Sequence, residues 1–489
     1  MKVRALPGLL CAVVCLFGCD KDKLSGGAGT QAEGQPSGPS APAASPEAGP
    51  PKEPEKPKGP PKPLNVLLLT VDSLRADMPW NGYDREIAPN LSKLAEQSVV
   101  YTNAYSVSSY TAKSVAAILS GRYPSTLYRN GFFFAAYSAA NEFFPEALQA
   151  QGIPTLSWHG HLYFNRGKGL DQGFKEWHVV PGITFDAQTD NHITSHKMTE
   201  LGIELLSKPE NTRPQFFAWA HYMDPHDQYI KHKESPDFGD KNRDRYDSEV
   251  FYTDLWLGKL FEWAEKQAWW KDTAVIIHAD HGEAFGEHGM YKHAFELWEV
   301  LTRVPLIIKA PGADPKRIDL PRSAIDLAPT IMELMGQRPL DGFVGQSLVP
   351  EVYGAEEPKP RDVIVTELAE DSNNPQRRAI RAGDYKLIAF GEPAWQYRLH
   401  NLKADPEEKQ DLAKTEPEKL EEMKRLYQQQ VEEISPILPY GGNKRRSGRT
   451  ASGPAGPPKS KEPERKKSEG GGAAAAEQSG ATQPGERGE

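Results

Sequence analysis

The sequence predicts an α/β fold, with a large, mostly parallel central sheet flanked by helices and a small C-terminal antiparallel-sheet subdomain. Two apolar runs support this prediction. Residues 65–71 (NVLLLTV) end on Asp72, and residues 274–279 (AVIIHA) end on Asp280 and His281. Such continuous apolar runs are typical of parallel strands that are buried on both faces. Because open α/β sheets carry their functional groups at the carboxyl edge, we expect these three polar side chains to form one metal site.

Around these two runs, the chain alternates between helix-like and strand-like segments. Pro89 precedes a short helix pattern at residues 90–96, and residues 99–104 form a short extended segment. Residues 111–120 have the apolar spacing of a helix, and Gly121 ends it because glycine readily adopts the left-handed conformation. This alternation is typical of a parallel sheet covered by helices.

The second half of the chain continues this pattern and then changes. Residues 216–221 and 304–309 are apolar runs that we interpret as buried strands, and residues 254–267 form an amphipathic helix between them. Short extended segments then predict the small antiparallel sheet, and a charged helix follows them. These last elements cover residues 363–367, 379–381, 385–390 and 416–434.

Length and charge limit the class of protein. The chain has 489 residues and a formal net charge of -9, and this length allows one large α/β domain with smaller appendages. Mild acidity gives no support to nucleic-acid binding, which usually requires a basic face. We therefore expect no nucleic acid among its partners.

The N-terminus has the composition of a targeting segment. Lys2 and Arg4 precede an apolar stretch, residues 9–17, that is too short to span a bilayer. The following Gly18 and Cys19 resemble the lipobox of bacterial lipoproteins, in which the cysteine is acylated. This resemblance implies a protein anchored by its lipid in the bacterial cell envelope, facing the periplasm or the cell exterior. An ordinary secretory signal peptide is the alternative.

Composition predicts five segments along the chain. A lipoprotein signal peptide is followed by a disordered Pro/Gly-rich tether, a catalytic domain, its C-terminal subdomain and a disordered low-complexity tail. Their bounds are residues 1–19, 20–63, 64–350, 351–435 and 436–489. All three cysteines, Cys11, Cys15 and Cys19, lie in the first segment. The body therefore has no thiol for a disulfide, a zinc–thiolate site or a cysteine nucleophile.

Further polar residues at predicted strand and helix ends could carry chemistry. Thr111 opens a helix, whose N-terminus suits an anionic oxygen, and a metal-activated hydroxyl there could act as a nucleophile. A capping role for Ser109 or Thr111 is the structural alternative. His226 follows a predicted strand, and Lys292 and His293 lie in a polar loop. Each residue alone fits a turn or a surface position, but their joint occurrence favours one functional site.

Together these motifs resemble the sulfatase-type members of the alkaline phosphatase superfamily. The run that ends at Asp72 is similar to the family's opening strand and metal carboxylate, and residues 280–289 resemble its second metal motif. Four further segments are similar to the family. Residues 88–95 resemble a helix motif, and residues 119–124 resemble the end of the nucleophile helix. Residues 221–226 resemble the strand that bears a substrate-binding histidine, and residues 383–388 resemble part of the C-terminal subdomain. The likeness covers residues 64–435 and implies the same fold.

The nucleophile position departs from the sulfatase pattern. Sulfatases carry a Cys/Ser-x-Pro-x-Arg signature whose first residue is converted to formylglycine, and this position is Thr111 here. Lys113 and Val115 replace the proline and the arginine, and threonine cannot yield the aldehyde. Threonine is the nucleophile in other branches of the superfamily, and residues 111–114 are similar to the version in phosphoethanolamine transferases.

The resemblance implies a set of roles for these residues. A divalent metal ion, zinc or manganese in preference to calcium, would be held by Asp72, Asp280, His281 and His293. Thr111 would attack the phosphorus or sulfur atom in line. His226 and His293, with Lys292 as a further candidate, would steady the non-bridging oxygens or hold a second ion.

Three functions remain open at this point. The first is a membrane-anchored, metal-dependent hydrolase or transferase that acts on phosphate (or sulfate) esters through Thr111, with an anionic ester such as an envelope lipid or glycan as substrate. The second is a sulfuric ester hydrolase that works without formylglycine. The third is a catalytically inactive, sulfatase-like lipoprotein that binds an envelope anion. The metal-ligand residues favour the first over the third, since a binding protein does not need them.

Overall fold

The computed structural model describes residues 59–184, 193–391 and 395–441, all of which belong to one compact unit. The predicted signal peptide and most of the predicted tether and tail lie outside these residues. Within the described part of the chain, no helix has both the length and the apolar character needed to cross a membrane.

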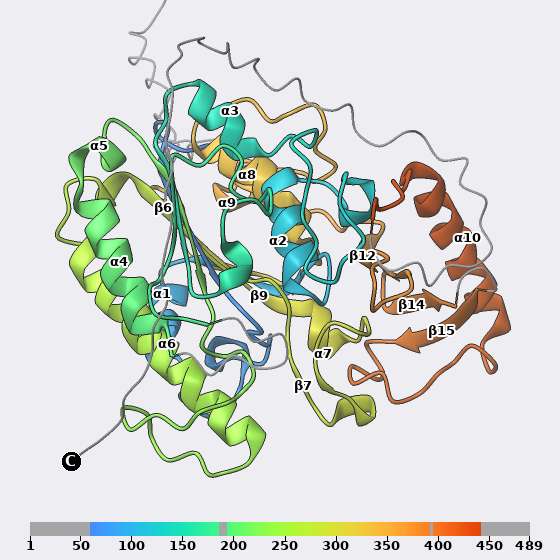
Figure 1. The fold of residues 1–489 in the computed structure, drawn as a ribbon. Coiled ribbons are helices and arrows are strands. Elements are labelled where there is room, and N and C mark those ends of the chain that lie inside the picture. The colour runs from blue at the N-terminus through green and yellow to red at the C-terminus, as the bar shows by residue number, and fades with distance from the viewer. Residues whose placement is uncertain (1–58, 185–192, 392–394, 442–489) are drawn as a thin grey trace, which may run out of the picture. The chain divides into compact units, whose positions relative to one another are not determined.

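A large mixed sheet forms the centre of the fold, as predicted (Figure 1). Its main strands run in the order β10, β2, β9, β6, β1, β5, β3, β4, and β11 pairs with β2 at the same edge. The strands from β6 to β4 are parallel to one another, whereas β9 is antiparallel to both of its neighbours. In this order, their bounds are Lys316–Ile318, Val99–Tyr105, Arg303–Lys309, Thr273–Ala279, Asn65–Val71, Phe217–Tyr222, Thr155–His159 and Glu176–Val179, with Arg322–Ser323 for β11.

Helices cover both faces of this sheet because the central strands are apolar on both sides. In β1, Val66 and Leu68 pack in a core with α2 and α8, while Leu67 and Leu69 pack in a second core with α1, α4 and α6. Figure 1 shows these two helical layers on opposite sides of the strands. The five helices are α1 (Pro89–Ala95), α2 (Thr111–Ser120), α4 (Ser195–Ser207), α6 (Asn242–Ala264) and α8 (Leu327–Leu334).

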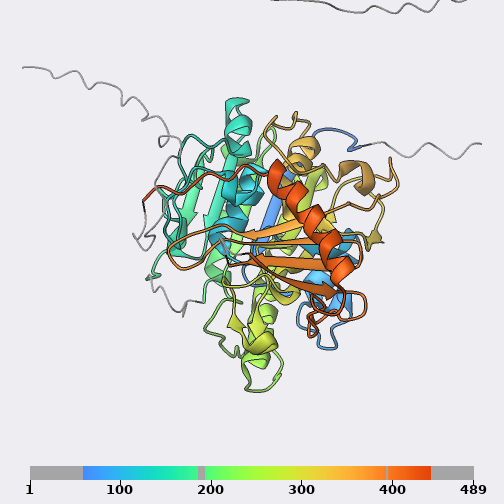
Figure 2. The ribbon, with the colours of Figure 1, turned by 90° about the vertical axis from the view of Figure 1, so that its right-hand side faces the viewer.

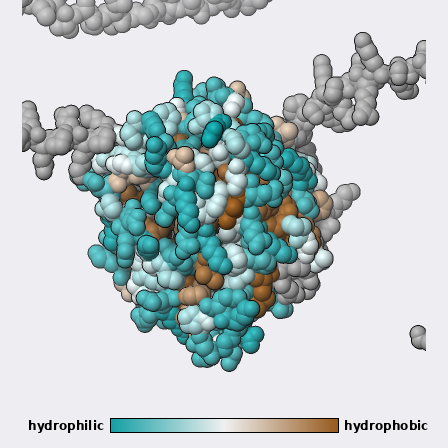
Figure 3. Space-filling view, turned by 90° about the vertical axis from the view of Figure 1, so that its left-hand side faces the viewer, coloured by the Kyte–Doolittle hydropathy of each residue, from teal (hydrophilic) through white to brown (hydrophobic). Residues whose placement is uncertain are grey.

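Shorter elements complete this part of the fold. They are the helices α3 (Phe144–Ala150), α5 (Pro209–Thr212), α7 (Glu299–Thr302) and α9 (Val349–Val352), and the hairpin strands β7 (Ala284–Phe285) and β8 (Tyr291–Lys292). The face on the side of α4 and α6 is mostly hydrophilic, with hydrophobic residues in small separate patches (Figure 3).

The C-terminal part forms the predicted antiparallel sheet, with one strand more than the sequence indicated. Its order is β12 (Ile364–Leu368), β13 (Arg377–Ala382), β14 (Tyr385–Phe390) and β15 (Gln396–Asn401). Helix α10 (Pro417–Glu433) lies across it, and the helix buries Met423 and Tyr427 against the sheet's core (Figure 2). β15 was missed because its sequence, QYRLHN, is mostly polar.

The long helix α6 begins at Asn242, so its predicted start at residue 254 is wrong. Its first half buries charged residues, which hid the amphipathic pattern. Farther along the helix, Asp254 accepts hydrogen bonds from the backbone N–H groups of Asn90 and Leu91, at 2.9 and 2.7 Å. A carboxylate from α6 therefore caps the N-terminus of α1.

A buried glutamate, paired with an arginine of its own sheet, links the C-terminal sheet to the main body and gives a first testable prediction. Glu367 in β12 accepts from the backbone N–H of Ser125 at 2.7 Å and pairs with Arg378 at 2.9 Å. Glu367→Ala would leave the buried guanidinium unpaired, so we expect the free energy of unfolding to fall by about 3–5 kcal/mol. Chemical denaturation measures this change.

A surface ion pair on α10 provides the control for this experiment. Glu422 pairs with Lys419 at 2.6 Å, and both side chains are partly exposed. Glu422→Ala should change the free energy of unfolding by less than about 1 kcal/mol. A similarly small change in Glu367→Ala would show that the buried pair does not hold the sheet in place.

Candidate active site

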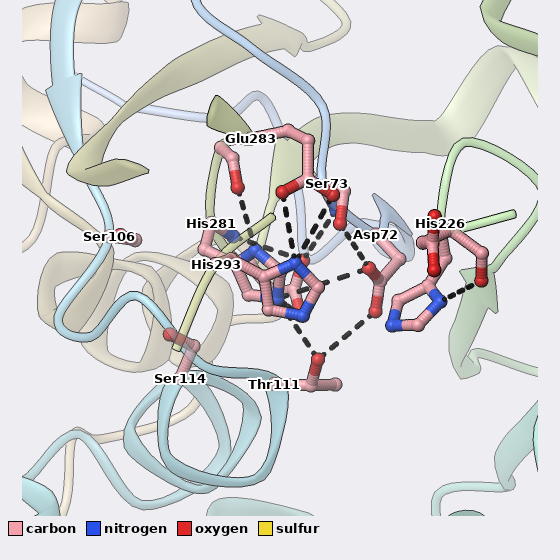
Figure 4. A network of polar contacts seen from close by, with 12 residues as sticks. Asp72, Ser73, Ser106, Thr111, Ser114, His226, His281, Glu283 and His293 are labelled. Atoms are coloured by element: carbon pink, nitrogen blue, oxygen red, sulfur yellow. Dashed lines mark hydrogen bonds and ion pairs between the residues drawn. The ribbon is translucent and has the colours of Figure 1, made fainter. Parts of the chain in front are cut away.

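The candidate site lies at the carboxyl edge of the central sheet, where three parallel strands end side by side. Asp72 follows β1, Asp280 and His281 follow β6, and His221 lies near the end of β5. Thr111 is the first residue of α2, and its side chain points toward Asp72 and His281 (Figure 4). The fold therefore brings together residues that are up to 209 positions apart through parallel strand pairing.

Asp72, Asp280 and His281 form a candidate metal site. Each offers one ligand atom, these atoms lie within 4.8 Å of one another, and all three residues are buried. His281 Nε2 is 3.3 Å from Asp280 Oδ2 and 3.9 Å from Asp72 Oδ1. Two carboxylates and an imidazole are a donor set that suits a divalent metal ion.

The protonation of these groups fits a metal ion. Burial and the charge of His293 lower the pKa of His281 to about 3, so its imidazole is neutral. His281 Nδ1 donates to the Gly282 carbonyl at 3.0 Å, which leaves a lone pair on Nε2. Burial and the charge of Asp72 raise the pKa of Asp280 to about 7. Asp280 Oδ2 is buried without a hydrogen-bond partner, and a bound cation would satisfy it.

Thr111 does not cap its own helix, and its hydroxyl faces the candidate metal ligands. The N-cap position of α2 is Tyr110, and the Ser109 hydroxyl donates to the Glu296 carbonyl at 2.6 Å. Thr111 Oγ1 lies 3.1 Å from Asp72 Oδ2 and 3.0 Å from His281 Nε2. The hydroxyl therefore contacts two of the three candidate metal ligands.

His221 is a site residue that the sequence did not single out. A hydrogen-bonded chain runs from the Trp219 indole to the Thr70 hydroxyl at 2.8 Å, then to His221 Nδ1 at 2.8 Å. His221 Nε2 then reaches Asp72 Oδ2 at 3.3 Å. Burial alone would raise the pKa of Asp72, but this hydrogen bond and the charge of His226 hold it well below its usual range. His221 therefore keeps Asp72 ionised and oriented.

Glu283 is a second supporting residue, which lies in the predicted metal motif but to which sequence reasoning assigned no role of its own. Its buried carboxylate contacts His293 Nδ1 with both oxygens, each at 3.2 Å. Burial alone would lower the pKa of His293, but Glu283 outweighs it and raises this pKa to about 9. His293 is therefore held as a cation, which has no free lone pair for a metal ion. It lies outside the group of candidate ligands, contrary to the ligand role expected from the sequence. Its ring centroid lies 4.2 Å from that of His281 and 5.1 Å from that of His226.

The two remaining predicted residues lie farther out. His226 Nδ1 contacts the Asp227 carbonyl at 2.8 Å, and its ring faces the histidine cluster. The Lys292 side chain is 49% exposed and pairs with the Asp227 carboxylate at 2.6 Å. Lys292 is thus at the rim, directed to Asp227. In Figure 4, Thr111, Asp72, His281 and His293 lie close together, and His226 lies beside Asp72.

Gly282 allows the close packing of this loop and supports a second prediction. A Cβ atom there would lie 2.2 Å from the Val300 carbonyl oxygen, which is too close for any real contact. We expect Gly282→Ala to displace His281 and to weaken metal binding by at least about tenfold. Calorimetric titration of zinc measures this loss. Gly342→Ala, where the added Cβ would make ordinary contact at 3.8 Å, should bind zinc as the wild type does.

Comparison with known proteins agrees with this geometry. The family model "Sulfatase" matches residues 64–337, and the model "N-sulphoglucosamine sulphohydrolase, C-terminal" matches residues 286–435. The chain is 25% identical to the choline-sulfatase of Rhizobium meliloti (strain 1021) over 431 residues, which cover 71% of this chain and 82% of the relative. It is 24% identical to an ulvan-active sulfatase of Formosa agariphila over 401 residues, covering 71% and 78%.

A solved structure shows the same fold. The phosphonate monoester hydrolase of Agrobacterium radiobacter superposes with a TM-score of 0.61 at 17% identity, covering 76% of this chain and 96% of that one. The first family model spans more than half of the chain and includes the strand ends and the helix that build the site. The chain therefore belongs to the sulfatase family of hydrolases.

Proposed function

We propose that this protein is a metal-dependent hydrolase or transferase of phosphate esters that uses Thr111 as its nucleophile. The observation that carries the proposal is the position of Thr111 Oγ1, within 3.1 Å of Asp72 and His281. A side chain that served only to cap α2 would not need to contact these groups.

Each residue of the site has a role in the proposed reaction. A divalent ion held by Asp72, Asp280 and His281, zinc or manganese in preference to calcium, would lower the pKa of the attacking hydroxyl and polarise the ester. Asp72 Oδ2 accepts a hydrogen bond from the Thr111 hydroxyl and thereby orients it toward the substrate. The hydrogen bond from His221 Nε2 holds the Asp72 carboxylate in this position.

Positive charge beside the hydroxyl supports phosphoryl transfer. Since Glu283 occupies His293 Nδ1, the Nε2–H of this cation remains to donate to a non-bridging oxygen. His226 lies next to it, and because its Nδ1–H donates to the Asp227 carbonyl, its Nε2 keeps a lone pair that could hold a second ion. Charge in the transition state of phosphoryl transfer is spread over these oxygens, so fixed donors and cations stabilise it. As the bond from Thr111 Oγ1 to phosphorus forms, the P–O bond to the alcohol breaks, and the alcohol leaves with the proton that the Thr111 hydroxyl gives up. The phosphoryl group on Thr111 would then be passed to water or to an acceptor hydroxyl.

The nucleophile helix argues against a formylglycine mechanism. Lys113, at the position of the signature proline, is fully buried and pairs with Asp371 from the segment after β12. Val115, at the position of the signature arginine, packs in the core and offers no charge. A phosphonate monoester hydrolase shares this fold, so the fold is compatible with a phosphorus ester as substrate.

A sulfate ester is the second candidate substrate. The curated relatives named above are sulfatases, one for choline sulfate by its name and one active on ulvan. If this protein cleaves sulfate esters, it must do so with Thr111 directly, because the described body has no residue that could yield formylglycine at this position.

A panel of substrates tests the proposal. We would incubate the full chain with zinc, manganese or calcium and measure turnover of an aryl phosphate, an aryl phosphodiester and an aryl sulfate. We expect turnover of at least one phosphate ester to exceed that of the sulfate. Preferred turnover of the sulfate would put the second candidate first, and no turnover together with no bound metal would indicate an inactive protein that binds envelope anions.

We also propose that the protein is anchored in the bacterial cell envelope through acylated Cys19, facing the periplasm or the cell exterior. The support is the sequence alone, in which the basic start and the short apolar stretch lead to Gly18 and Cys19. Labelling of cells with a fatty-acid probe should mark the wild type and leave Cys19→Ala unlabelled. Labelling of both would show that Cys19 is not the acylated residue.

A further inference from the structure

A stack of aromatic rings begins at Tyr110, the residue that precedes the candidate nucleophile. The Tyr110 ring packs on Phe133, with centroids 4.1 Å apart and planes inclined by 26°. Phe133 in turn lies nearly parallel to Phe295, with centroids 6.2 Å apart and planes inclined by 13°. These rings come from three segments that are far apart in the sequence, so the stack is a product of the fold.

Backbone contacts tie this stack to the site. Tyr110 immediately precedes Thr111, and the Ala294 N–H donates to the Ser109 carbonyl at 2.9 Å. The loop that carries Phe295 therefore runs beside the start of α2. It is also the loop of His293, which contacts the metal-site histidine His281. The stack and the reacting groups thus share two segments of chain.

The outer part of the stack is exposed and yet held in place. The Phe295 residue is 48% exposed, although a phenyl ring gains stability from burial. Its neighbour Glu296 pairs with Arg377 at 3.5 Å and with Arg398 at 3.6 Å, both from the C-terminal sheet. The Phe133 N–H donates to the Ser372 hydroxyl at 3.2 Å. The protein therefore fixes an exposed apolar surface next to its polar site.

We propose that Phe133 and Phe295, supported by Tyr110, form the subsite for the organic group of the ester, and that this group contains a ring with an apolar face. This inference rests on the proposed function and names the class of its substrate. Near-parallel phenyl rings offer flat surfaces, which match an aromatic ring or the apolar face of a pyranose better than a flexible alkyl chain. A metal site at one end would hold the anionic group while the aromatic platform holds the ring.

Equilibrium binding tests the platform without requiring turnover. We would titrate the zinc-loaded full chain with phenylphosphonate, a pyranosyl C-phosphonate, hexylphosphonate and methylphosphonate. The organic group of each probe is joined to phosphorus by a P–C bond, so an ester hydrolase binds the probe without cleaving it. The ring-bearing probes should bind more tightly than methylphosphonate. Phe295→Ala and Phe133→Leu should each reduce this preference about three- to tenfold, and Phe295→Tyr should keep it. Whichever of the phenyl and pyranosyl probes loses more affinity in these variants identifies the kind of ring that the subsite binds.

Two results would overturn the inference. One is equal binding of the ring-bearing probes and methylphosphonate by the wild type, including no binding of either. The other is an equal or greater loss for hexylphosphonate, which would indicate an alkyl site. Val344→Ala, an exposed apolar residue outside the stack, should leave the preference unchanged. If the ring preference is found but no ester is turned over, the proposed function fails while the subsite stands.

Discussion

Replacement of Thr111 by alanine should lower phosphate-ester turnover by at least about a thousandfold, because it removes the attacking oxygen itself. The loss should appear in kcat, because the substrate is bound through the metal and the histidines, and Thr111→Ala does not change these contacts. Steady-state kinetics on the best substrate of the panel measures it. The small size of the change keeps the helix and its packing intact.

Thr111→Ser is the matched variant for this prediction. It retains a hydroxyl at the same position and should therefore retain measurable turnover, while its zinc content equals that of the alanine variant. Turnover by Thr111→Ala within tenfold of the wild-type rate would mean that water or another side chain attacks the ester. The contacts of the Thr111 hydroxyl with Asp72 and His281 would then have no role in catalysis.

Asp280→Asn should have two opposite effects, a loss of metal binding and a gain in the stability of the metal-free protein. Asp280 is fully buried beside the ionised Asp72, and its Oδ2 has no hydrogen-bond partner. Without a cation, this arrangement destabilises the fold. A neutral amide removes the repulsion, so we expect the free energy of unfolding of the metal-free protein to rise by about 1–3 kcal/mol. Zinc affinity should fall at the same time.

Denaturation in the presence of a chelator, combined with zinc titration, measures both effects. Asp272→Asn serves as the control, because this carboxylate is partly exposed and pairs with Lys62 on the surface. It should alter stability by less than about 0.5 kcal/mol and should not alter zinc binding. A destabilised Asp280→Asn protein with wild-type zinc affinity would show that Asp280 has a structural role in place of the metal role proposed.

Part of this site could be predicted from the sequence because strand ends are easy to locate. The apolar runs before Asp72 and Asp280 mark buried strands, and parallel pairing then forces their ends together. The Gly121 end of α2 was predictable for a similar reason, since the residue adopts the left-handed conformation with φ of 61°. These predictions depend on local patterns and one general rule of sheet topology.

The supporting residues could not be found in this way. His221 lies inside an apolar strand, and its role follows only from its register with Thr70 on β1. Glu283 becomes informative only once His293 is seen to contact it, across a turn and a hairpin. The pairing of Lys113 with Asp371 joins residues 258 positions apart. Such contacts depend on tertiary packing, which no local pattern specifies.

The fold shows the same division. Helix α6 carries so many buried charges in its first half that its amphipathic pattern is lost, and these charges are explained by partners from elsewhere in the chain, such as Arg85 for Asp247. Strand β15 has little apolar character of its own and is defined by its pairing with β14. Elements with a strong apolar pattern were predictable, and elements stabilised by polar partners from elsewhere were not.

The central claim, a covalent intermediate on Thr111, is tested most directly by trapping it. The full chain with zinc would be mixed with an aryl phosphate, quenched in acid during turnover and digested, and the peptides would be examined by mass spectrometry. We predict one added phosphoryl group on Thr111 in the wild type and none in Thr111→Ala. A phosphoryl group on another side chain, or an unmodified Thr111 throughout turnover, would contradict the claim.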